Sequence, residues 1–239
     1  LFDNLNLTIK DFTDEGQFIT FIGQSGCGKT QLLKMISGIS KPDSGKIMLY
    51  GKEIKESDNI PMVFQQYSSF EWMTVLENIA LPMKLAGIDK KTREERARKI
   101  INLIGLDGSE NKYCRYGVLS GGMLQRASIG RALACDSKLL MLDEYSSGLD
   151  YFTKFELQDL LLKIFNNRDV DRTFLMVTHD ISEAVYLSNR IYILEPKPCR
   201  IKEIIDIKFS QPRTQAIRET DEFKDYYAKV LKALNETVK

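Results

Sequence analysis

The sequence has little of what a disulfide-stapled, zinc-binding or membrane-spanning protein would show. Its 239 residues include one histidine, and the four cysteines, at positions 27, 114, 135 and 199, form no CxxC pair. This pattern disfavours a Cys/His zinc cage and a disulfide framework, so we expect reduced thiols. No apolar run approaches the roughly 18 residues that a spanning helix needs. The first twelve residues lack the pattern of a signal peptide.

An excess of either charge is also missing. The chain carries 34 Lys and Arg residues against 33 Asp and Glu residues, for a formal net charge of +1. Nucleic-acid binders usually show a basic excess or stripe, so we expect no nucleic-acid partner. The 43% of hydrophobic residues and 28% of charged residues are typical of a globular chain. The length favours one domain over residues 1–239, with any further unit inserted into it.

Alternating strand and helix patterns predict an α/β fold. Helical spacing (i, i+3, i+4, i+7) occurs at Leu32, Met35, Ile36 and Ile39 and again in two later segments. Strands alternating with helices favour a mainly parallel sheet. Short apolar runs rich in β-branched and aromatic residues predict six strands, over residues 17–22, 46–50, 60–64, 138–142, 172–177 and 190–194.

The composition changes along the chain suggest how the domain is organised. Residues 68–134 lack convincing strands, and we interpret them as a helical subdomain inserted into a core of about 1–67 and 135–195. A C-terminal extension, about 196–239, contains a strand-like stretch over 201–209 and a final helix. We expect one stripe of that helix to pack on the core rather than form a partner groove: Phe223, Tyr226, Tyr227, Val230, Leu231 and Leu234.

A phosphate-binding motif follows the first predicted core strand. It reads Gly23-Gln24-Ser25-Gly26-Cys27-Gly28-Lys29-Thr30 and fits G-x-x-x-x-G-K-[ST], between a strand and a helix as the motif requires. The backbone N–H groups of such a loop and the helix N-terminus surround an anion. We expect Lys29 to contact the β- and γ-phosphates of ATP and Thr30 to ligate Mg²⁺. The alternative is a Gly-rich turn with an exposed lysine.

A carboxylate pair ends the predicted strand at 138–142. Asp143 is the first polar residue after the apolar run, where the C-terminal ends of parallel strands gather and ligands bind. We expect Asp143 to help hold Mg²⁺ and Glu144 to polarise the attacking water. Alone this pattern often means only that a strand has reached solvent, but together with the phosphate loop it indicates nucleotide hydrolysis.

A further string resembles the LSGGQxQR signature of ATP-binding cassette (ABC) ATPases. It reads Leu119-Ser120-Gly121-Gly122-Met123-Leu124-Gln125-Arg126, and an ordinary capped helix start is the alternative. Other segments resemble family landmarks in the same order: Gln65 the Q-loop glutamine, Ser147-Gly148-Leu149-Asp150 the D-loop, and Thr178-His179-Asp180 the switch histidine. The resemblance covers about residues 1–213.

The resemblance implies a P-loop NTPase (RecA-like) core with an N-terminal antiparallel β portion. It also implies a head-to-tail dimer, in which the phosphate loop of one chain and the signature of its twin enclose each ATP. Catalytic roles then fall on Gln65, Glu144 and His179, and metal binding on Thr30, Gln65 and Asp143. Nucleotide contacts beyond the phosphate loop fall on Ser120, Gly121, Gly122, Gln125 and Asp150.

The implied partners are a second copy of the ATPase, membrane permease subunits and, indirectly, a solute-binding protein. The implied location is peripheral, on the cytoplasmic face of the membrane. Residues 70–82 and the late Gln211-Pro212-Arg213 are most similar to ATPases of nitrate, taurine and alkanesulfonate importers. The aromatic stretch 67–73 suits a docking surface for the permease, or equally burial within the subdomain.

The sequence departs from the family pattern at several positions. Tyr145 stands where proline is usual after the catalytic glutamate, and Gly148 replaces a common alanine, which we expect to loosen the loop. The adenine-stacking aromatic of the family would lie just before Leu1. We therefore expect the native chain to begin further upstream.

Other classes of function remain open at this stage. A soluble P-loop kinase or GTPase would explain Lys29 and Asp143 but would leave the LSGG string without a role. A non-transport cassette protein acting on ribosomes or DNA shares every motif, although such proteins usually carry two cassettes or a long coiled coil. Export or lipid trafficking is a closer rival to import. The prediction is an ATP-hydrolysing importer subunit.

Overall fold

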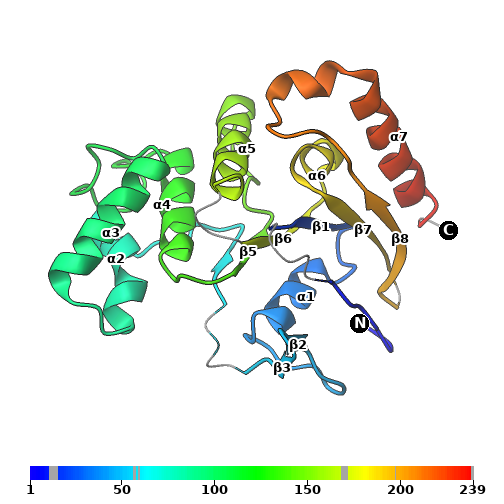
Figure 1. Cartoon of the computed structure of the whole chain (residues 1–239), viewed down its shortest axis with the longest axis horizontal. Coiled ribbons are helices and arrows are strands. Elements are labelled where there is room, and N and C mark those ends of the chain that lie inside the picture. Colours follow the sequence, from blue (N-terminus) through cyan, green and yellow to red (C-terminus); the bar gives the residue numbers. More distant parts are fainter. Residues whose placement is uncertain (11–15, 56–57, 59, 168–171, 197, 238–239) are drawn as a thin grey trace.

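A central six-stranded sheet organises the chain (Figure 1). The computed structural model describes residues 1–10, 16–55, 58, 60–167, 172–196 and 198–237. The strand order is β4-β5-β6-β1-β7-β8, parallel throughout except for the antiparallel β7–β8 pair at one edge. The strands are β1 (Phe18–Gly23), β4 (Met62–Val63), β5 (Leu139–Asp143), β6 (Thr173–Thr178), β7 (Arg190–Glu195) and β8 (Arg200–Asp206).

Helices cover both faces of this sheet. In Figure 1, α1 lies on one face while α5, α6 and α7 lie on the other, and α2, α3 and α4 form a group beyond the β4 edge. A separate two-stranded hairpin pairs β2 (Met48–Leu49) with β3 (Lys52–Glu53). The helices are α1 (Lys29–Ile36), α2 (Val75–Leu85), α3 (Lys90–Leu103), α4 (Gly121–Leu133), α5 (Tyr151–Phe165), α6 (Ile181–Leu187) and α7 (Asp221–Asn235), and the 3₁₀ turn η2 spans Gln215–Glu219.

The period-2 alternation of the strands divides the core into two apolar clusters. Ile19 and Phe21 of β1 belong to the cluster that packs against α1, whereas Phe18 and Ile22 point to the opposite face. The second cluster is the larger one, and it continues without a break from the sheet into α2, α3 and α4. The helical group is therefore packed on the sheet layer. The domain boundaries at 67 and 135 remain predictions.

Side-chain caps fix where most of the helices begin. Thr74 accepts a hydrogen bond from the backbone N–H of Glu77, whose side chain accepts one from the Thr74 N–H in return, which is a capping box. The other helices with a side-chain N-cap start after Asp89, Ser120, Asp150, Asp180 and Thr220. Three of these caps, at Ser120, Asp150 and Asp180, lie in or beside the signature, D-loop and switch motifs.

The α/β fold with a mainly parallel sheet is confirmed, but several predicted elements differ in extent. The strand expected at 46–50 shortens to β2 in the small hairpin, and that at 60–64 shortens to β4. Residues 1–7 form no strand; Phe2 makes an isolated parallel bridge to Cys199, whose N–H donates to the carbonyl of Leu1. The stretch expected at 201–209 is β8, which ends at Asp206.

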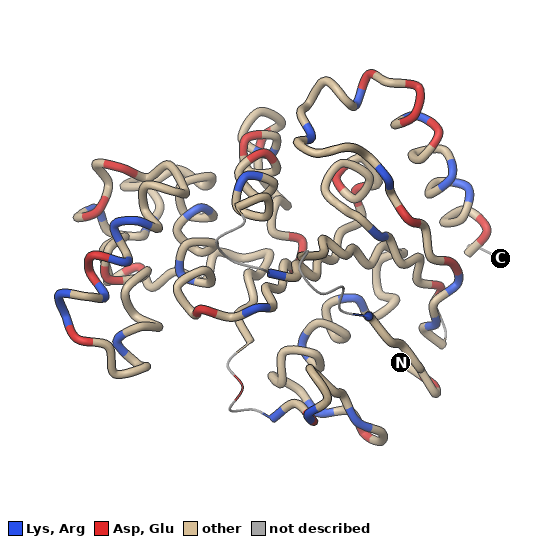
Figure 2. The backbone as a smooth tube through the Cα atoms, in the orientation of Figure 1, with Lys and Arg blue, Asp and Glu red and all other residues tan. Residues whose placement is uncertain are grey.

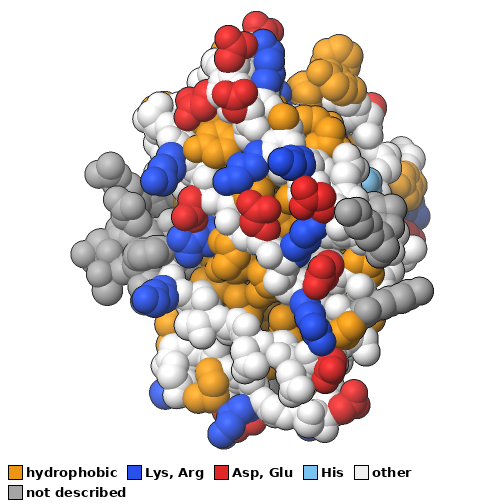
Figure 3. Space-filling view, turned by 90° about the vertical axis from the view of Figure 1, so that its right-hand side faces the viewer, with side chains coloured by type: hydrophobic (Ala, Val, Ile, Leu, Met, Phe, Trp, Pro, Cys, Tyr) orange, Lys and Arg blue, Asp and Glu red, His pale blue; other side chains and the backbone are white. Residues whose placement is uncertain are grey.

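The apolar stripe predicted on the last helix is only partly buried. Phe223 and Val230 are buried in α7, but Tyr227 and Leu231 are 38% and 39% exposed, and Ala233 is buried beside them instead. The reason is that α7 packs along α6, β7 and β8 through a narrower face than the sequence suggests. Figure 3 shows acidic and basic side chains interspersed with apolar ones on this side of the molecule.

Charges are mixed over the whole backbone, with acidic and basic residues alternating along α3 and α7 (Figure 2). Within the described residues, no helix combines the length and apolarity that crossing a bilayer requires.

Candidate functional site

The phosphate loop lies at the C-terminal end of β1, a central strand, and leads into α1. Lys29 is only 6% exposed, and its ammonium group donates to the carbonyl oxygens of Gly23 (2.9 Å) and Gln24 (3.0 Å). These bonds hold the lysine across the loop. Ser25, Gly26 and Thr30 are exposed on the same loop, so its outer side is open to a ligand.

Thr30 and Asp143 lie together, as the sequence predicts. The Thr30 hydroxyl donates to Oδ1 of Asp143 at 2.9 Å, which joins the start of α1 to the end of β5. Burial raises the pKa of the Asp143 carboxyl above its ordinary value, against the Thr30 hydrogen bond, which lowers it. A nearby cation would therefore favour the ionised carboxylate.

The Thr30–Asp143 pair fits Mg²⁺ in its donor chemistry. Both donors are hard oxygens, and Mg²⁺ in phosphate sites is typically held by one or two carboxylates together with substrate phosphates and water. Within the described part of the chain there is no cluster of three or more His, Cys, Asp or Glu residues that could hold a metal. The arrangement therefore suits a metal that arrives with a phosphate ligand.

Glu144 and His179 meet beside this pair. Oε2 of Glu144 lies 3.4 Å from Nδ1 of His179, and their side chains are 21% and 62% exposed. The backbone of Glu144 has φ 44°, a left-handed conformation that is strained for a residue with a side chain. Its N–H donates to the carbonyl of Val177 on the adjacent strand β6, which holds this turn in place. A carboxylate and an imidazole thus project together from the C-terminal edge of the sheet.

Gln65 lies at a different part of the same edge. Its side-chain amide donates to the hydroxyl of Ser147 at 3.2 Å, so it contacts the D-loop rather than the Thr30–Asp143 pair. The predicted role of Gln65 as a metal ligand remains a prediction. Gln65 also lines a groove of about 440 Å³, together with Gln66, Tyr67, Ser69, Glu71, Cys114, Tyr116, Leu124, Ser147 and Gly148.

The aromatic stretch beside this groove is split between burial and exposure. Asn78 of α2 is fully buried, and its amide bonds the backbone of Phe70, Met73 and Thr74, which fixes the loop. Phe70 is half-buried, with its ring centroid 5.1 Å from that of Trp72, which is 71% exposed. Burial within the subdomain therefore applies to part of the stretch, and the docking surface remains a prediction for its exposed residues.

The signature string forms the start of α4. Ser120 is exposed and caps the helix by accepting from the N–H of Met123 at 3.3 Å. A Cβ on Gly122 would lie 2.4 Å from the Thr153 methyl, and one on Gly121 would lie 2.7 Å from the Tyr67 hydroxyl. The two glycines therefore permit close packing on α5 and on the Q-loop, besides leaving the helix tip uncovered.

The structure places Gln125 differently from the other predicted nucleotide contacts. Its side chain is fully buried, and Nε2 points to the carbonyl of Phe64 at 3.5 Å. Gln125 lies on the face of α4 that packs on the rest of the domain, next to Phe64, the residue before Gln65. The contact of Gln125 with a nucleotide remains a prediction.

The D-loop joins β5 to α5. Asp150 is exposed and caps α5 by accepting from the N–H of Thr153 at 3.1 Å, and hydrogen bonds with the side chain and the backbone of Thr153 lower the pKa of its carboxyl. Gly148 has φ 77°, a conformation that favours glycine. The turn itself therefore favours glycine at this position, and the expectation that Gly148 loosens the loop remains a prediction.

Two features of the site were missed by the sequence reasoning. Glu183 is 1% exposed and accepts three side-chain hydrogen bonds; the only sequence signal is the Asp180-x-x-Glu183 spacing of a helix start.

The second feature is a pair of cysteines. Cys27 of the phosphate loop and Cys199 are both buried and interact. The hydrogen bond with Cys199, followed by the charge of Lys29, lowers the pKa of the Cys27 thiol against the effect of burial. No sequence spacing links those two cysteines.

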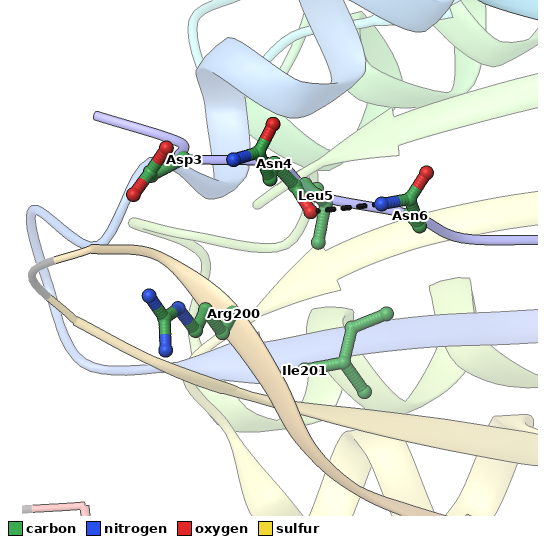
Figure 4. Close-up of a pocket in the computed structure, with 6 residues that line it drawn as sticks. All are labelled: Asp3, Asn4, Leu5, Asn6, Arg200 and Ile201. Carbon is green, nitrogen blue, oxygen red and sulfur yellow. Dashed lines mark hydrogen bonds between the residues drawn. The ribbon is translucent and has the colours of Figure 1, made fainter.

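A second hollow lies away from these groups. It has a volume of about 370 Å³ and is lined by Asp3, Asn4, Leu5, Asn6, Arg200 and Ile201. Figure 4 shows these side chains around the N-terminal segment and β8, with Asn6 donating to the carbonyl of Asn4. None of them belongs to the predicted nucleotide set.

The chain is similar to known proteins along most of its length. Residues 2–147 match the ABC transporter family. An uncharacterized ABC transporter ATP-binding protein of Methanocaldococcus jannaschii is 43% identical over 99% of this chain and 85% of its own length. The aliphatic sulfonates import ATP-binding protein SsuB of Bacillus cereus is 40% identical over 96% of this chain and 86% of its own length.

The fold is also similar to solved structures. One is a dimeric ATP-binding cassette in a post-hydrolysis state bound to ADP and Pi. It has a TM-score of 0.73 and 28% identity, over 87% of this chain and 91% of the other.

Proposed function

Because the chain belongs to the ABC transporter family of ATP-binding proteins, we propose that it is the ATPase subunit of an importer for small solutes of the nitrate, sulfonate or taurine type. The 40% identity to an aliphatic sulfonates import protein supports both the direction and the solute class. The similarity of residues 70–82 and 211–213 to nitrate, taurine and sulfonate importers agrees with it. The solute would be selected by the permease subunits and the solute-binding protein.

The residues of the site can share the work of hydrolysis. Lys29 and the loop N–H groups would bind the phosphates of ATP, and Thr30 and Asp143 would hold Mg²⁺. Mg²⁺ supplies neutralisation of the charge that develops on the phosphate oxygens. Glu144 would orient the attacking water and accept its proton. His179, 3.4 Å from that carboxylate, would contact the γ-phosphate from the other side.

The observation that best supports hydrolysis is that two pairs of side chains, Thr30 with Asp143 and Glu144 with His179, lie beside the phosphate loop at the ends of β5 and β6. Thr30 and Asp143 provide hard oxygens 2.9 Å apart, and Glu144 follows Asp143 directly in the chain. If Glu144 and His179 formed only a structural ion pair, they would have no reason to lie beside the Thr30–Asp143 pair and the phosphate loop. Catalysis of phosphoryl transfer is mostly positioning and charge neutralisation, which is what these groups can offer.

The active form would be a head-to-tail dimer. The Ser120 end of α4 is exposed, and its helix N-terminus attracts anions, so a second copy could apply it to the ATP held by Lys29. The dimeric state of the 28% identical cassette supports this arrangement. Permease subunits would dock at the groove beside Gln65 and Trp72, and a solute-binding protein would act through them.

Hydrolysis is tested on the purified chain by measuring phosphate release from MgATP. Glu144→Gln should retain ATP binding and lose nearly all turnover, because the amide cannot accept a proton from water. Glu222→Gln, at an exposed carboxylate in the first turn of α7, is the matched control and should hydrolyse normally. Full turnover by Glu144→Gln would refute the role of Glu144, and turnover lost equally in both variants would refute its specificity.

Import is tested by reconstituting the chain with the permease and solute-binding protein encoded beside its gene. Labelled alkanesulfonate, taurine or nitrate should move toward the side of the membrane that carries the ATPase, and only with ATP. Movement away from that side would assign an exporter. ATP hydrolysis without movement of any solute would assign a function outside transport.

A further inference from the structure

A buried carboxylate lies behind the catalytic edge of the sheet. Glu183, in the first turn of α6, is 1% exposed, and both of its oxygens accept hydrogen bonds. Oε1 accepts from the Ser146 hydroxyl (2.7 Å) and from the Gln158 amide (3.2 Å), and Oε2 accepts from the Thr178 hydroxyl (2.7 Å). A buried carboxylate is costly unless it is well paired, so this one must be held for a reason.

The partners of Glu183 lie next to the catalytic groups. Ser146 is two residues after Glu144 and directly precedes the D-loop, while Thr178 directly precedes His179. Glu183 therefore holds the loop that carries the water-activating carboxylate and the loop that carries the imidazole. It does so from behind, without being open to solvent. The strained backbone of Glu144, at φ 44°, requires such support from its surroundings.

The same network reaches the C-terminal extension. Gln158 of α5 donates to Glu183 through Nε2 and accepts from Arg218 of η2 through Oε1 at 2.6 Å. Arg218 also donates to the backbone carbonyl and the hydroxyl of Ser182, the neighbour of Glu183. The guanidinium is mostly buried, and burial lowers its pKa while the charges of Asp180 and Glu183 raise it. The extension thus supplies a positive charge that steadies the buried carboxylate.

We propose that Glu183 is a positioning residue for ATP hydrolysis, which sets the separation of Glu144 and His179 through Ser146 and Thr178. The proposal rests on the proposed function. In this role Glu183 contacts no substrate atom and acts only by positioning Glu144 and His179, which do. Displacement of catalytic groups by about 1 Å can cost on the order of a hundredfold in rate, so loss of this restraint should reach the turnover number.

A purely structural role for Glu183 makes a different prediction. If Glu183 served only to begin α6 and fill the core, its loss would lower stability and change the amount of folded protein. The kcat of the folded fraction and the KM for MgATP would then both equal those of the wild type. The kcat of protein that is shown to be folded therefore distinguishes the positioning role from the structural one.

The test is Glu183→Gln in the full chain, with phosphate release measured over a range of MgATP and folding checked by thermal melting. The amide keeps the size of the side chain but presents NH₂ to one of the two loops. An NH₂ in place of Oε2 cannot accept the hydrogen bond that the Thr178 hydroxyl donates, and one in place of Oε1 cannot accept those that Ser146 and Gln158 donate. We expect kcat to fall about tenfold to a hundredfold, while KM for MgATP stays within about twofold because Lys29 is untouched.

Single-contact variants and a matched control complete the experiment. Ser146→Ala and Thr178→Val each remove one donor and should lower kcat by a smaller factor in the same direction; they decide the matter if Glu183→Gln does not fold. Asp159→Asn is the control, because Asp159 also joins α5 to α6, through the Tyr186 hydroxyl at 2.6 Å, but is not bonded to either catalytic loop. Its kcat should equal that of the wild type.

Two results would overturn the proposal: wild-type kcat in folded Glu183→Gln, or in both single-contact variants if it fails to fold, and an equal loss of kcat in Asp159→Asn. A wild-type chain that hydrolyses no ATP would instead overturn the proposed function.

Discussion

Nδ1 of His179 lies 3.4 Å from Oε2 of Glu144, although the two residues are 35 positions apart in the chain. Their strands β5 and β6 are direct neighbours, with Asp143 paired to Val177, so each residue emerges at the same edge. The imidazole is mostly exposed and the carboxylate only partly so.

This relationship predicts that His179→Ala loses turnover without losing stability. The side chain is 62% exposed, so its removal should change the melting temperature little. We expect kcat to fall about a hundredfold or more, the usual effect of removing a positioned acid–base or phosphate-contacting group. Phosphate release and thermal melting measured on the same sample test this. Turnover within twofold of the wild type would show that His179 has no part in the reaction.

Lys29→Ala should weaken ATP binding. Hydrogen bonds to charged groups contribute about 1.5–3 kcal/mol, which corresponds to about a 10- to 150-fold loss of affinity. Equilibrium titration with a fluorescent ATP analogue measures it. Lys52→Ala, an exposed lysine on the β2–β3 hairpin, is the matched control and should bind as the wild type does. Equal affinity of both variants would contradict the role of Lys29.

The raised pKa of Asp143 predicts how stability changes with pH when no metal is present. Burial makes the folded chain hold this proton more tightly than the unfolded chain, whose carboxyl keeps a pKa near 3.8. The free energy of unfolding contributed by Asp143 should therefore fall as the pH rises from about that value through the raised folded value. Asp143→Asn, which has no charge, should be the more stable chain at neutral pH in EDTA.

Denaturant melts of Asp143→Asn and the wild type at several pH values measure this difference. The advantage of the amide should shrink as the pH is lowered toward 3.8. A wild type that is more stable than Asp143→Asn at neutral pH in EDTA would contradict it. Addition of MgATP should then stabilise only the wild type strongly, since its carboxylate is needed for the metal.

Gly148 tests the geometry of the D-loop. A Cβ at this position would meet nothing within 4 Å, so only the backbone conformation at φ 77° opposes a side chain. Gly148→Ala should lower the free energy of unfolding by about 1–2 kcal/mol, the cost of a left-handed residue. Gly148→Asn should lose less, because asparagine tolerates this conformation better. Urea unfolding of the pair measures it, and equal stability of all three chains would contradict the assigned turn.

The sequence predicts most of the fold because its main signals are local. Period-2 and period-3.6 patterns identify the strands β1, β5, β6 and β7 and the helices α1, α3 and α5. The short strands β2 and β4 are predicted too long, because their extent depends on neighbouring strands that a local pattern does not contain. The same limit explains α7, whose buried face is set by the helix and strands it packs on.

The candidate site divides in the same way. Thr30, Asp143, Glu144 and His179 can be found from motifs, because the ends of adjacent parallel strands must meet. The burial of Gln125 and the three bonds of Glu183 depend on contacts between segments far apart in sequence. The left-handed turn at Gly148 could not be told from a flexible one by composition alone.

The central claim is that two copies of this chain enclose ATP between the phosphate loop of one and the Ser120 end of the other. Its most direct test is the mass in solution of Glu144→Gln, measured by sedimentation equilibrium with and without ATP. The account predicts twice the 27.4 kDa of the chain when ATP is present. It also predicts a monomer that still binds ATP when Ser120→Arg is added. A Glu144→Gln chain that binds ATP and stays monomeric, or a dimer that survives Ser120→Arg, would contradict it.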